Sequence, residues 1–323
     1  MAAEKGMALQ HGGDPPAPTP AFTELANPTA AGDAPSTRAA APTVSRRDRR
    51  DCMVKVLAGG VLVTLVAVLW AWAAADAPAS TATWASADAS VVALRYVTVP
   101  PTQPSSRPGL LLLLHGSGGD ENDLLQVGAA LAPRDYLIAS LRAPIPFGFG
   151  GRGYRWFRGA SASPTPEALD GDIAESCDAI FAFIRGAPQE LGTDPSRVQL
   201  FGFSQGATLT WTAMLSAWDR PRLIRAAAAV SGRLMPDLLR PGAALHTRLA
   251  PPAQLAGAHL FASHGSADSI TPIAIGRDNT VNFAAYMGEL GTSALEWHEY
   301  AETDHVVSTE CLADATEFLK QNA

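Results

Sequence analysis

A single serine stands between two glycines in the stretch VQLFGFSQGATLTW, residues 198–211. The five residues from Gly202 to Gly206 match the pattern G-x-S-x-G, in which an apolar strand ends at a sharp turn and a helix begins. Glycine is needed on both sides because larger side chains would collide with neighbouring backbone. Ser204, held at the end of a sheet, is therefore the candidate nucleophile. The alternative is an ordinary turn in which Ser204 only caps the helix.

A serine hydroxyl is a weak nucleophile until a base takes its proton, and on such a sheet an acid and a histidine follow the serine in that order. Asp268 follows the apolar stretch AHLFASHG, and His305 lies between the last predicted strand and the last predicted helix. We therefore expect a Ser204-Asp268-His305 triad. Asp304 is the rival acid, but adjacent side chains rarely point at each other, which favours Asp268. The alternatives are a turn aspartate and a capping histidine.

The attack of a serine on an acyl group also needs N–H groups that stabilise the negative oxygen of the intermediate. One is expected from the backbone of Gln205, and the other from the glycine-rich stretch HGSGG at residues 115–119. Ser117 N–H is our choice there, with Gly116 and Gly118 as open alternatives, and an ordinary glycine-rich turn as the competing interpretation. These glycines lack the spacing of a nucleotide-binding loop, so no nucleotide cofactor is expected.

Elements of alternating type must position these residues. Apolar and β-branched runs predict strands at residues 91–99, 109–115, 136–141, 197–203, 224–232, 258–265 and 294–300. Apolar residues at helical spacing predict helices at residues 122–132, 166–187, 205–218, 278–291 and 305–321. Strands that alternate with helices indicate the α/β class, with a mostly parallel sheet covered by helices on both faces. Ligands of such sheets bind beyond the carboxyl ends of the strands, where the candidate triad stands.

Composition limits the class of protein. The chain has 323 residues, of which 47% are hydrophobic, so a sizeable core can form. A formal net charge of −7 and the lack of a basic stripe argue against nucleic-acid binding. The three cysteines, Cys52, Cys177 and Cys311, have neither metal-site nor disulfide-framework spacing, so no metal is expected. A single Cys177–Cys311 bridge stays open.

The N-terminal part predicts a membrane anchor. Residues 1–52 are rich in Ala, Pro and Thr and end in a basic cluster, which predicts a disordered cytoplasmic tail. Residues 56–75 carry no charge and are long enough to cross a lipid bilayer. Arginines before this run and tryptophans near its far end predict a single transmembrane helix at residues 53–75 with the catalytic domain outside the cytoplasm. The alternative is a signal peptide that starts at Met53 and is cleaved, which would release a secreted protein.

The chain beyond this run is predicted to contain two further parts. Residues 76–87 are small and polar and are expected to form a linker. Residues 88–323 are expected to form a single catalytic domain.

Stretches that follow one another along the chain resemble the phospholipase/carboxylesterase family of α/β-hydrolases, which includes acyl-protein thioesterases. They are LLHGSGGDENDL, RAPIPFGFGGRGYRWF, FGFSQGATL, SHGSADSITPI and ETDHVVS, and the resemblance extends from Val91 to the C-terminus. It implies an α/β-hydrolase fold with little or no lid and no metal or cofactor. It also implies cleavage of small carboxylic esters or thioesters. The family's triad and oxyanion donors fall on the residues chosen above.

Two departures from the family limit what the resemblance implies. The usual members of the family are soluble and intracellular and lack such a tail and apolar run. The resemblance therefore does not imply a cytosolic acyl-protein substrate for this chain. The loop from Phe147 to Trp156 is rich in arginine and glycine, which leaves its substrate contacts open. The aromatic residues Tyr154, Trp156 and Phe157 are expected either to line an acyl or leaving-group pocket or to pack in the core.

The sequence therefore predicts a serine hydrolase that forms an acyl-enzyme on Ser204. A peptidase or a dienelactone-type hydrolase on the same fold is the alternative among enzymes, although a dienelactone-type enzyme more typically carries cysteine at this position. A membrane-anchored binding protein without catalysis is the alternative of another class, since fold does not fix function. Acyl length, leaving group and oligomeric state are left open.

Overall fold

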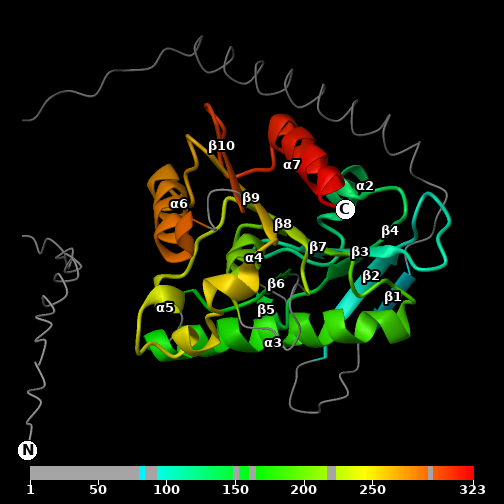
Figure 1. Cartoon of the computed structure of the whole chain (residues 1–323), viewed down its shortest axis with the longest axis horizontal. Coiled ribbons are helices and arrows are strands. Elements are labelled where there is room, and N and C mark those ends of the chain that lie inside the picture. The colour runs from blue at the N-terminus through cyan, green and yellow to red at the C-terminus, as the bar shows by residue number, and fades with distance from the viewer. Residues whose placement is uncertain (1–79, 84–92, 148–152, 160–164, 217–222, 290–293) are drawn as a thin grey trace, which may run out of the picture. The chain divides into compact units, whose positions relative to one another are not determined.

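The computed structural model describes residues 80–83, 93–147, 153–159, 165–216, 223–289 and 294–323. An eight-stranded sheet runs through this part of the chain in the order β1-β2-β4-β3-β7-β8-β9-β10 (Figure 1). Strand β2 pairs antiparallel with both β1 and β4, and all the other pairs are parallel. The predicted α/β class with a mostly parallel sheet is therefore confirmed.

The strands of this sheet are β1 Ser80–Thr83, β2 Arg95–Val99, β3 Gly109–Leu114, β4 Tyr136–Leu141, β7 Val198–Phe203, β8 Ala226–Val230, β9 His259–Gly265 and β10 Leu295–Tyr300. A separate two-stranded sheet consists of β5 Ile145–Phe147 and β6 Gly153–Arg155. The α-helices are α2 Leu125–Leu131, α3 Pro166–Glu190, α4 Gln205–Leu215, α5 Pro236–Leu239, α6 Ile273–Met287 and α7 Thr309–Gln321. Two short 3-10 helices are η2 Leu245–Arg248 and η3 Pro252–Leu255.

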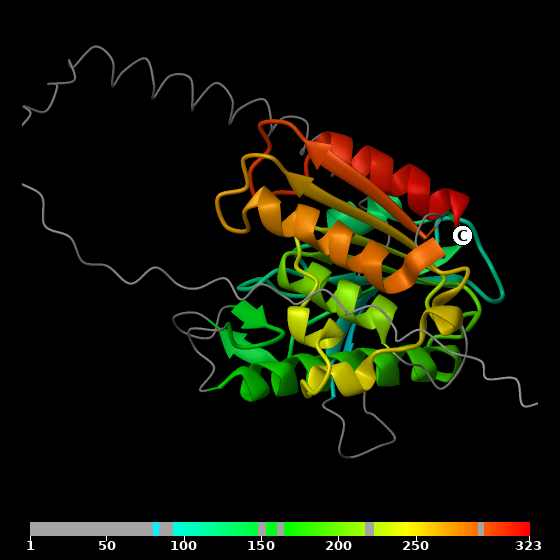
Figure 2. The ribbon, with the colours of Figure 1, turned by 60° about the vertical axis from the view of Figure 1, so that its left-hand side comes forward.

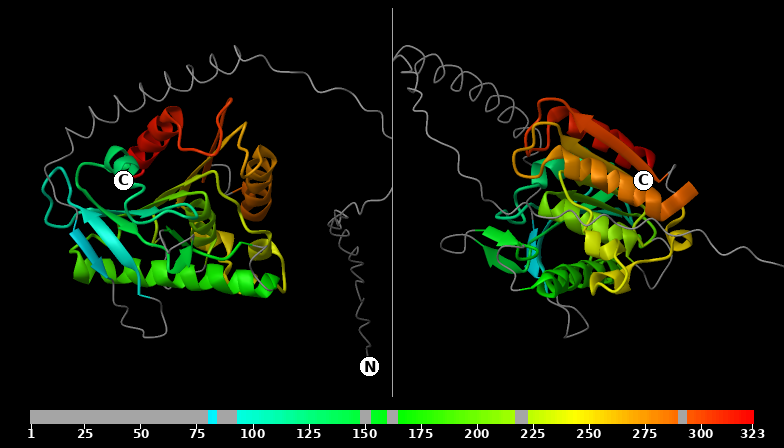
Figure 3. Two further views of the ribbon diagram at one scale, coloured as in Figure 1. Left: turned by 180° about the vertical axis from the view of Figure 1, so that it is seen from behind. Right: turned by 90° about the vertical axis from the view of Figure 1, so that its left-hand side faces the viewer.

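Strand β3 shows why helices must cover both faces of the sheet. Leu110, Leu112 and Leu114 pack into the core that contains side chains of α3, α4 and α6, whereas Leu111 and Leu113 pack into the core that contains side chains of α2 and α7. Successive side chains of a strand point to opposite faces, so an unbroken apolar run needs cover on both sides. Figures 2 and 3 show the sheet between these two layers of helices.

The sheet begins earlier in the chain than the sequence predicts. Residues 76–87 are expected to be a linker, but Ser80–Thr83 form strand β1, in register with Arg95–Thr98 of β2. A strand of small and threonine residues has little apolar pattern of its own, and its backbone hydrogen bonds come from the edge of β2. The boundary expected at residue 88 is therefore corrected: the folded part includes residues 80–83.

The described residues of the glycine-rich stretch, 142–147 and 153–159, include two short strands. Ile145 pairs with Arg155 and Phe147 with Gly153, which makes an antiparallel pair of short strands. An isolated bridge between Gly119 and Tyr154 ties this pair to the loop after β3. Strands of three residues are too short to show an alternating pattern, so the sequence does not predict them.

None of the helices in the described part of the chain is long and apolar enough to cross a membrane. The tail at residues 1–52 and the predicted transmembrane helix at residues 53–75 lie outside the described residues. The membrane anchor therefore stays a prediction.

The two described cysteines are free thiols on opposite faces of the sheet, so they form no bridge. Cys177 lies on α3 and Cys311 on α7. Burial raises the pKa of Cys177 to about 12 and that of Cys311 to about 11. Because the thiolate is the reactive form, we expect neither cysteine to react with iodoacetamide in mildly alkaline buffer while the protein is folded. Peptide mass spectrometry should find both alkylated in denaturant, and alkylation of either in the folded protein would contradict this packing.

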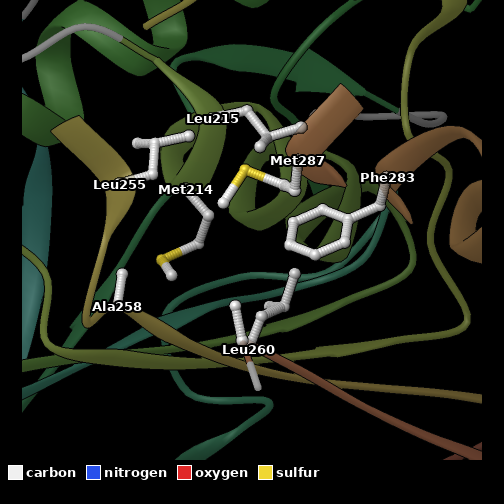
Figure 4. Close-up of a pocket in the computed structure, with 8 residues that line it drawn as sticks. Met214, Leu215, Leu255, Ala258, Leu260, Phe283 and Met287 are labelled. Carbon is white, nitrogen blue, oxygen red and sulfur yellow. The ribbon is translucent and has the colours of Figure 1, made fainter. Parts of the chain in front are cut away.

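A small apolar cavity of about 10 Å³ lies between α4, α6 and β9, where Met214, Leu260, Phe283 and Met287 line it (Figure 4). A space of this size holds about one water molecule, and such a molecule needs polar partners that these side chains lack. The cavity is a packing gap in the core, and it shares no lining residue with the cavity at Ser204 described below.

Candidate active site

Ser204 joins β7 to α4 in a strained conformation, with φ 56° and ψ −114°. A non-glycine residue in such a conformation costs on the order of 1–3 kcal/mol, which the surrounding structure must supply. The two flanking glycines are required by close backbone contacts. A Cβ on Gly202 would lie 2.3 Å from the carbonyl oxygen of Gly206, and a Cβ on Gly206 would lie 1.9 Å from that of Leu114.

The structure brings the three residues of the predicted triad together. Asp268 follows β9, and His305 lies between β10 and α7. The Nε2 atom of His305 is 2.8 Å from Ser204 Oγ, and its Nδ1 atom is 2.7 Å from Asp268 Oδ2. The ring of Phe203 packs against the imidazole at a centroid distance of 5.0 Å. A base is thus placed within hydrogen-bond reach of the hydroxyl, and a carboxylate orients that base.

Asp268 is buried, and its hydrogen bonds favour the ionised form. Its Oδ1 atom accepts hydrogen bonds from the backbone N–H groups of Ile270 at 2.9 Å and Thr271 at 2.7 Å. Burial alone would raise the pKa of Asp268, but these N–H groups and His305 outweigh burial and hold the pKa below its usual value. The carboxylate is therefore available to stabilise a protonated imidazole.

Asp304, the rival acid, does not contact the imidazole. Its Oδ1 atom accepts hydrogen bonds from the backbone N–H and the hydroxyl of Ser269, both at 2.8 Å. The same atom accepts the backbone N–H of His305, also at 2.8 Å. Asp304 therefore links the loop that carries Asp268 to the loop that carries His305.

The loop after β3 lies beside the serine. A Cβ on Gly116 would be 3.3 Å from the Cβ of Ser204. The N–H of Gly118 donates to the Tyr154 carbonyl at 2.8 Å, which removes it as a donor to a ligand. Ser117 is exposed, and no acceptor for its N–H occurs within the part of the chain described above. Gln205 is the first residue of α4, so its N–H has no acceptor inside that helix.

Trp156 supports this loop and does not line a pocket. Its side chain is fully buried, and its indole N–H donates to the carbonyl oxygen of His115 at 2.9 Å. The amide side chain of Gln205 accepts the backbone N–H of Trp156 and donates to the carbonyl oxygen of Phe157, each at 3.0 Å. The pocket role considered for Trp156 is therefore corrected: its large side chain fills the core beneath the loop.

His115 is neutral and shapes the same loop. Its Nε2 atom accepts the backbone N–H of Ala143 at 3.1 Å, so its Nδ1–H donates to the Gly116 carbonyl at 2.7 Å. Burial is the main reason that the pKa of His115 lies below the usual value.

Tyr154 also belongs to the support of the loop. Arg142 forms hydrogen bonds of 2.5 Å with both carboxylate oxygens of the buried Glu121, and it donates to the Tyr154 hydroxyl at 3.0 Å. The Tyr154 carbonyl accepts the N–H of Gly118, as described above. Only Phe157 of the three aromatic residues lines the cavity at Ser204.

That cavity has a volume of about 200 Å³. Its lining includes Ser204 and Gln205, the apolar side chains of Phe157, Leu169 and Met235, and residues of the loops after β8 and β9. Pockets for drug-sized ligands are roughly 300–1,000 Å³, so this cavity fits a smaller group.

A mostly parallel sheet with a strained serine between a strand and a helix, followed by an acid and a histidine at later strand ends, defines an α/β-hydrolase. The sequence model of the phospholipase/carboxylesterase family matches residues 96–323. The chain belongs to the phospholipase/carboxylesterase family, and the protein is a hydrolase.

Solved structures share this fold. The carboxylesterase of Bacillus cereus is 21% identical, with a TM-score of 0.55 over 71% of this chain and 95% of its own. The carboxylesterase of Mesorhizobium loti is 23% identical, with a TM-score of 0.53 over 70% of this chain and 94% of its own. The structure of esterase PE8 is 22% identical, with a TM-score of 0.54 over 70% of this chain and 97% of its own. Among the curated proteins, none matches this sequence.

Proposed function

We propose that this hydrolase cleaves a carboxylic ester or thioester through an acyl-enzyme on Ser204. The observation that carries the proposal is the position of the His305 imidazole, hydrogen-bonded to Ser204 Oγ on one side and to Asp268 on the other. The small cavity at Ser204 supports a small-molecule substrate.

The reaction follows from these positions. Ser204 Oγ attacks the acyl carbon while His305 Nε2 takes its proton, and the N–H groups of Ser117 and Gln205 bind the negative oxygen. The protonated imidazole, stabilised by Asp268, gives its proton to the departing alcohol or thiol, which leaves the acyl group on Ser204. A water molecule then attacks the acyl-enzyme with His305 as the base, and the carboxylic acid leaves.

Labelling with a fluorophosphonate probe tests this proposal, because an activated serine displaces fluoride from phosphorus and keeps the phosphonyl group. We expect strong labelling of the wild type, none of Ser204→Ala, and little of His305→Ala and Asp268→Ala. Ser196, exposed just before β7 and so at the opposite end of that strand, provides the control Ser196→Ala, which should label like the wild type. No labelling of folded wild type, or equal labelling of Ser204→Ala, would overturn the proposal.

A further inference from the structure

One charged residue lines the cavity at Ser204. Arg233 follows β8 and is exposed, and the cavity lining also includes the apolar residues Phe157, Leu169 and Met235. An ester that lies with its acyl carbon at Ser204 therefore shares the cavity with a guanidinium. A cavity built only for a hydrocarbon chain would not need one.

Arg233 has no acidic partner among the residues that the structure describes. Some other arginines of the domain do have such a partner: Arg240 lies 2.6 Å from Asp237, and Arg277 lies 2.7 Å from Glu299. Within the described residues, the positive charge of Arg233 therefore has no carboxylate beside it. Its planar set of N–H donors matches a carboxylate or a phosphate.

The backbone that carries Arg233 is held in place by buried hydrogen bonds. The N–H of Arg233 donates to the Thr208 hydroxyl at 3.2 Å. The buried amide of Asn279, on α6, accepts the N–H of Leu234 at 2.9 Å and donates to the Gly232 carbonyl at 3.0 Å. These contacts fix the backbone position from which the Arg233 side chain extends.

The same loop is joined to the nucleophile. The N–H of Ser204 donates to the carbonyl oxygen of Val230, the last residue of β8, at 3.0 Å. Ser231, which also lines the cavity, has a φ of 56°, and this turns the chain sharply after the strand. The distance between the reacting serine and the start of the arginine side chain is thereby set by the sheet.

We propose that Arg233 binds a second, anionic group of the substrate, so that the preferred esters carry a carboxylate or a phosphate besides the bond that is cleaved. This inference rests on the proposed role of Ser204. The anionic group belongs either to the acyl part or to the alcohol part of the ester. In both cases the guanidinium of Arg233 would bind it in the same way.

Matched pairs of esters separate these positions. Ethyl hexanoate and monoethyl adipate differ by a carboxylate on the acyl side, and pentyl butanoate and 3-butanoyloxypropyl phosphate differ by a phosphate on the alcohol side. In at least one pair, we expect the wild type to have the higher kcat/KM for the charged ester. Arg233→Gln should lower kcat/KM for that ester about tenfold, mainly through KM, and should leave the neutral ester nearly unchanged.

Two further variants sharpen the test. Arg233→Lys should keep part of the preference, because the charge stays while the planar donors are lost. Arg225→Gln removes an exposed arginine just before β8, at the end of that strand away from Ser204, and should not change the preference. Added salt should weaken the preference of the wild type, because salt screens an exposed charge.

The outcomes distinguish the two proposals. A wild type that prefers neither charged ester, or an Arg233→Gln variant that loses charged and neutral activity equally, would overturn the role of Arg233 while the serine mechanism stands. Hydrolysis of both members of a pair by Ser204→Ala at the wild-type rate would show that the proposed function itself is wrong.

Discussion

Asp268→Asn is expected to lower kcat about 10⁴-fold while the fold is retained. The Oδ1 atom of Asp268 accepts two backbone N–H groups, so an asparagine would keep its oxygen there and turn its NH₂ group toward His305. The Nδ1 atom would then accept a hydrogen bond, and the proton of the neutral imidazole would move to Nε2. An Nε2–H faces Ser204 as a donor and cannot take the proton of the hydroxyl.

Asp304→Asn is the matched control for this prediction. Asp304 acts only as an acceptor of N–H and O–H groups, and an asparagine oxygen keeps that ability. We expect kcat to fall less than about tenfold, because the change is confined to weaker hydrogen bonds between two loops. The measurement is steady-state hydrolysis of a small ester by both variants, with circular dichroism as the check of folding. A larger loss in Asp304→Asn than in Asp268→Asn would exchange the roles of the two acids.

Gly206→Ala is expected to destabilise the protein by about 3 kcal/mol or more and to abolish labelling of Ser204. The added methyl group would lie 1.9 Å from the carbonyl oxygen of Leu114. That atom belongs to β3, a strand buried on both faces, so it cannot move aside without disturbing the central sheet. Either α4 moves away, which displaces Ser204 and the Gln205 N–H, or the domain does not fold.

Gly171→Ala provides the contrast. Gly171 lies inside α3, and a Cβ built there meets nothing within 4 Å. Alanine is the better helix former, so we expect this variant to be more stable by about 0.5–1 kcal/mol with unchanged labelling. Denaturant unfolding of both variants gives the comparison. Equal stability of Gly206→Ala and the wild type would refute the close contact between α4 and β3.

The sequence predicts the parts of this fold whose patterns are local. The apolar runs of β3, β4 and β7 stand almost at the predicted residues, because a strand buried on both faces needs an unbroken apolar run. Residues 202–206 contain the glycines that the sharp turn requires. The position of Ser204 can therefore be predicted from these five residues alone. The order of acid and histidine then follows from where later strands end.

Other features depend on contacts that a single sequence does not display. Strand β1 is held by the edge of β2, and the β5–β6 pair by its bridge to the loop after β3. Tyr154 and Trp156 lie in a stretch with several aromatic residues. The spacing of these residues does not distinguish aromatic side chains that support a loop from those that contact a ligand. Asn279 and Arg233 match no motif, and their places near the serine come from the packing of α6 and the loop after β8.

The separation of the reacting groups along the chain bears on when their contacts can form during folding. Ser204 and His305 are 101 residues apart, and the histidine enters through the segment between β10 and α7. Pairings that are distant in sequence form slowly, because loop closure costs entropy before the contacts compensate for it. An intermediate with β3, β7 and β8 already paired would hold the strained serine turn without a base beside it. In such an intermediate the Ser204 hydroxyl would stay inert until the segment between β10 and α7 brings His305 beside it.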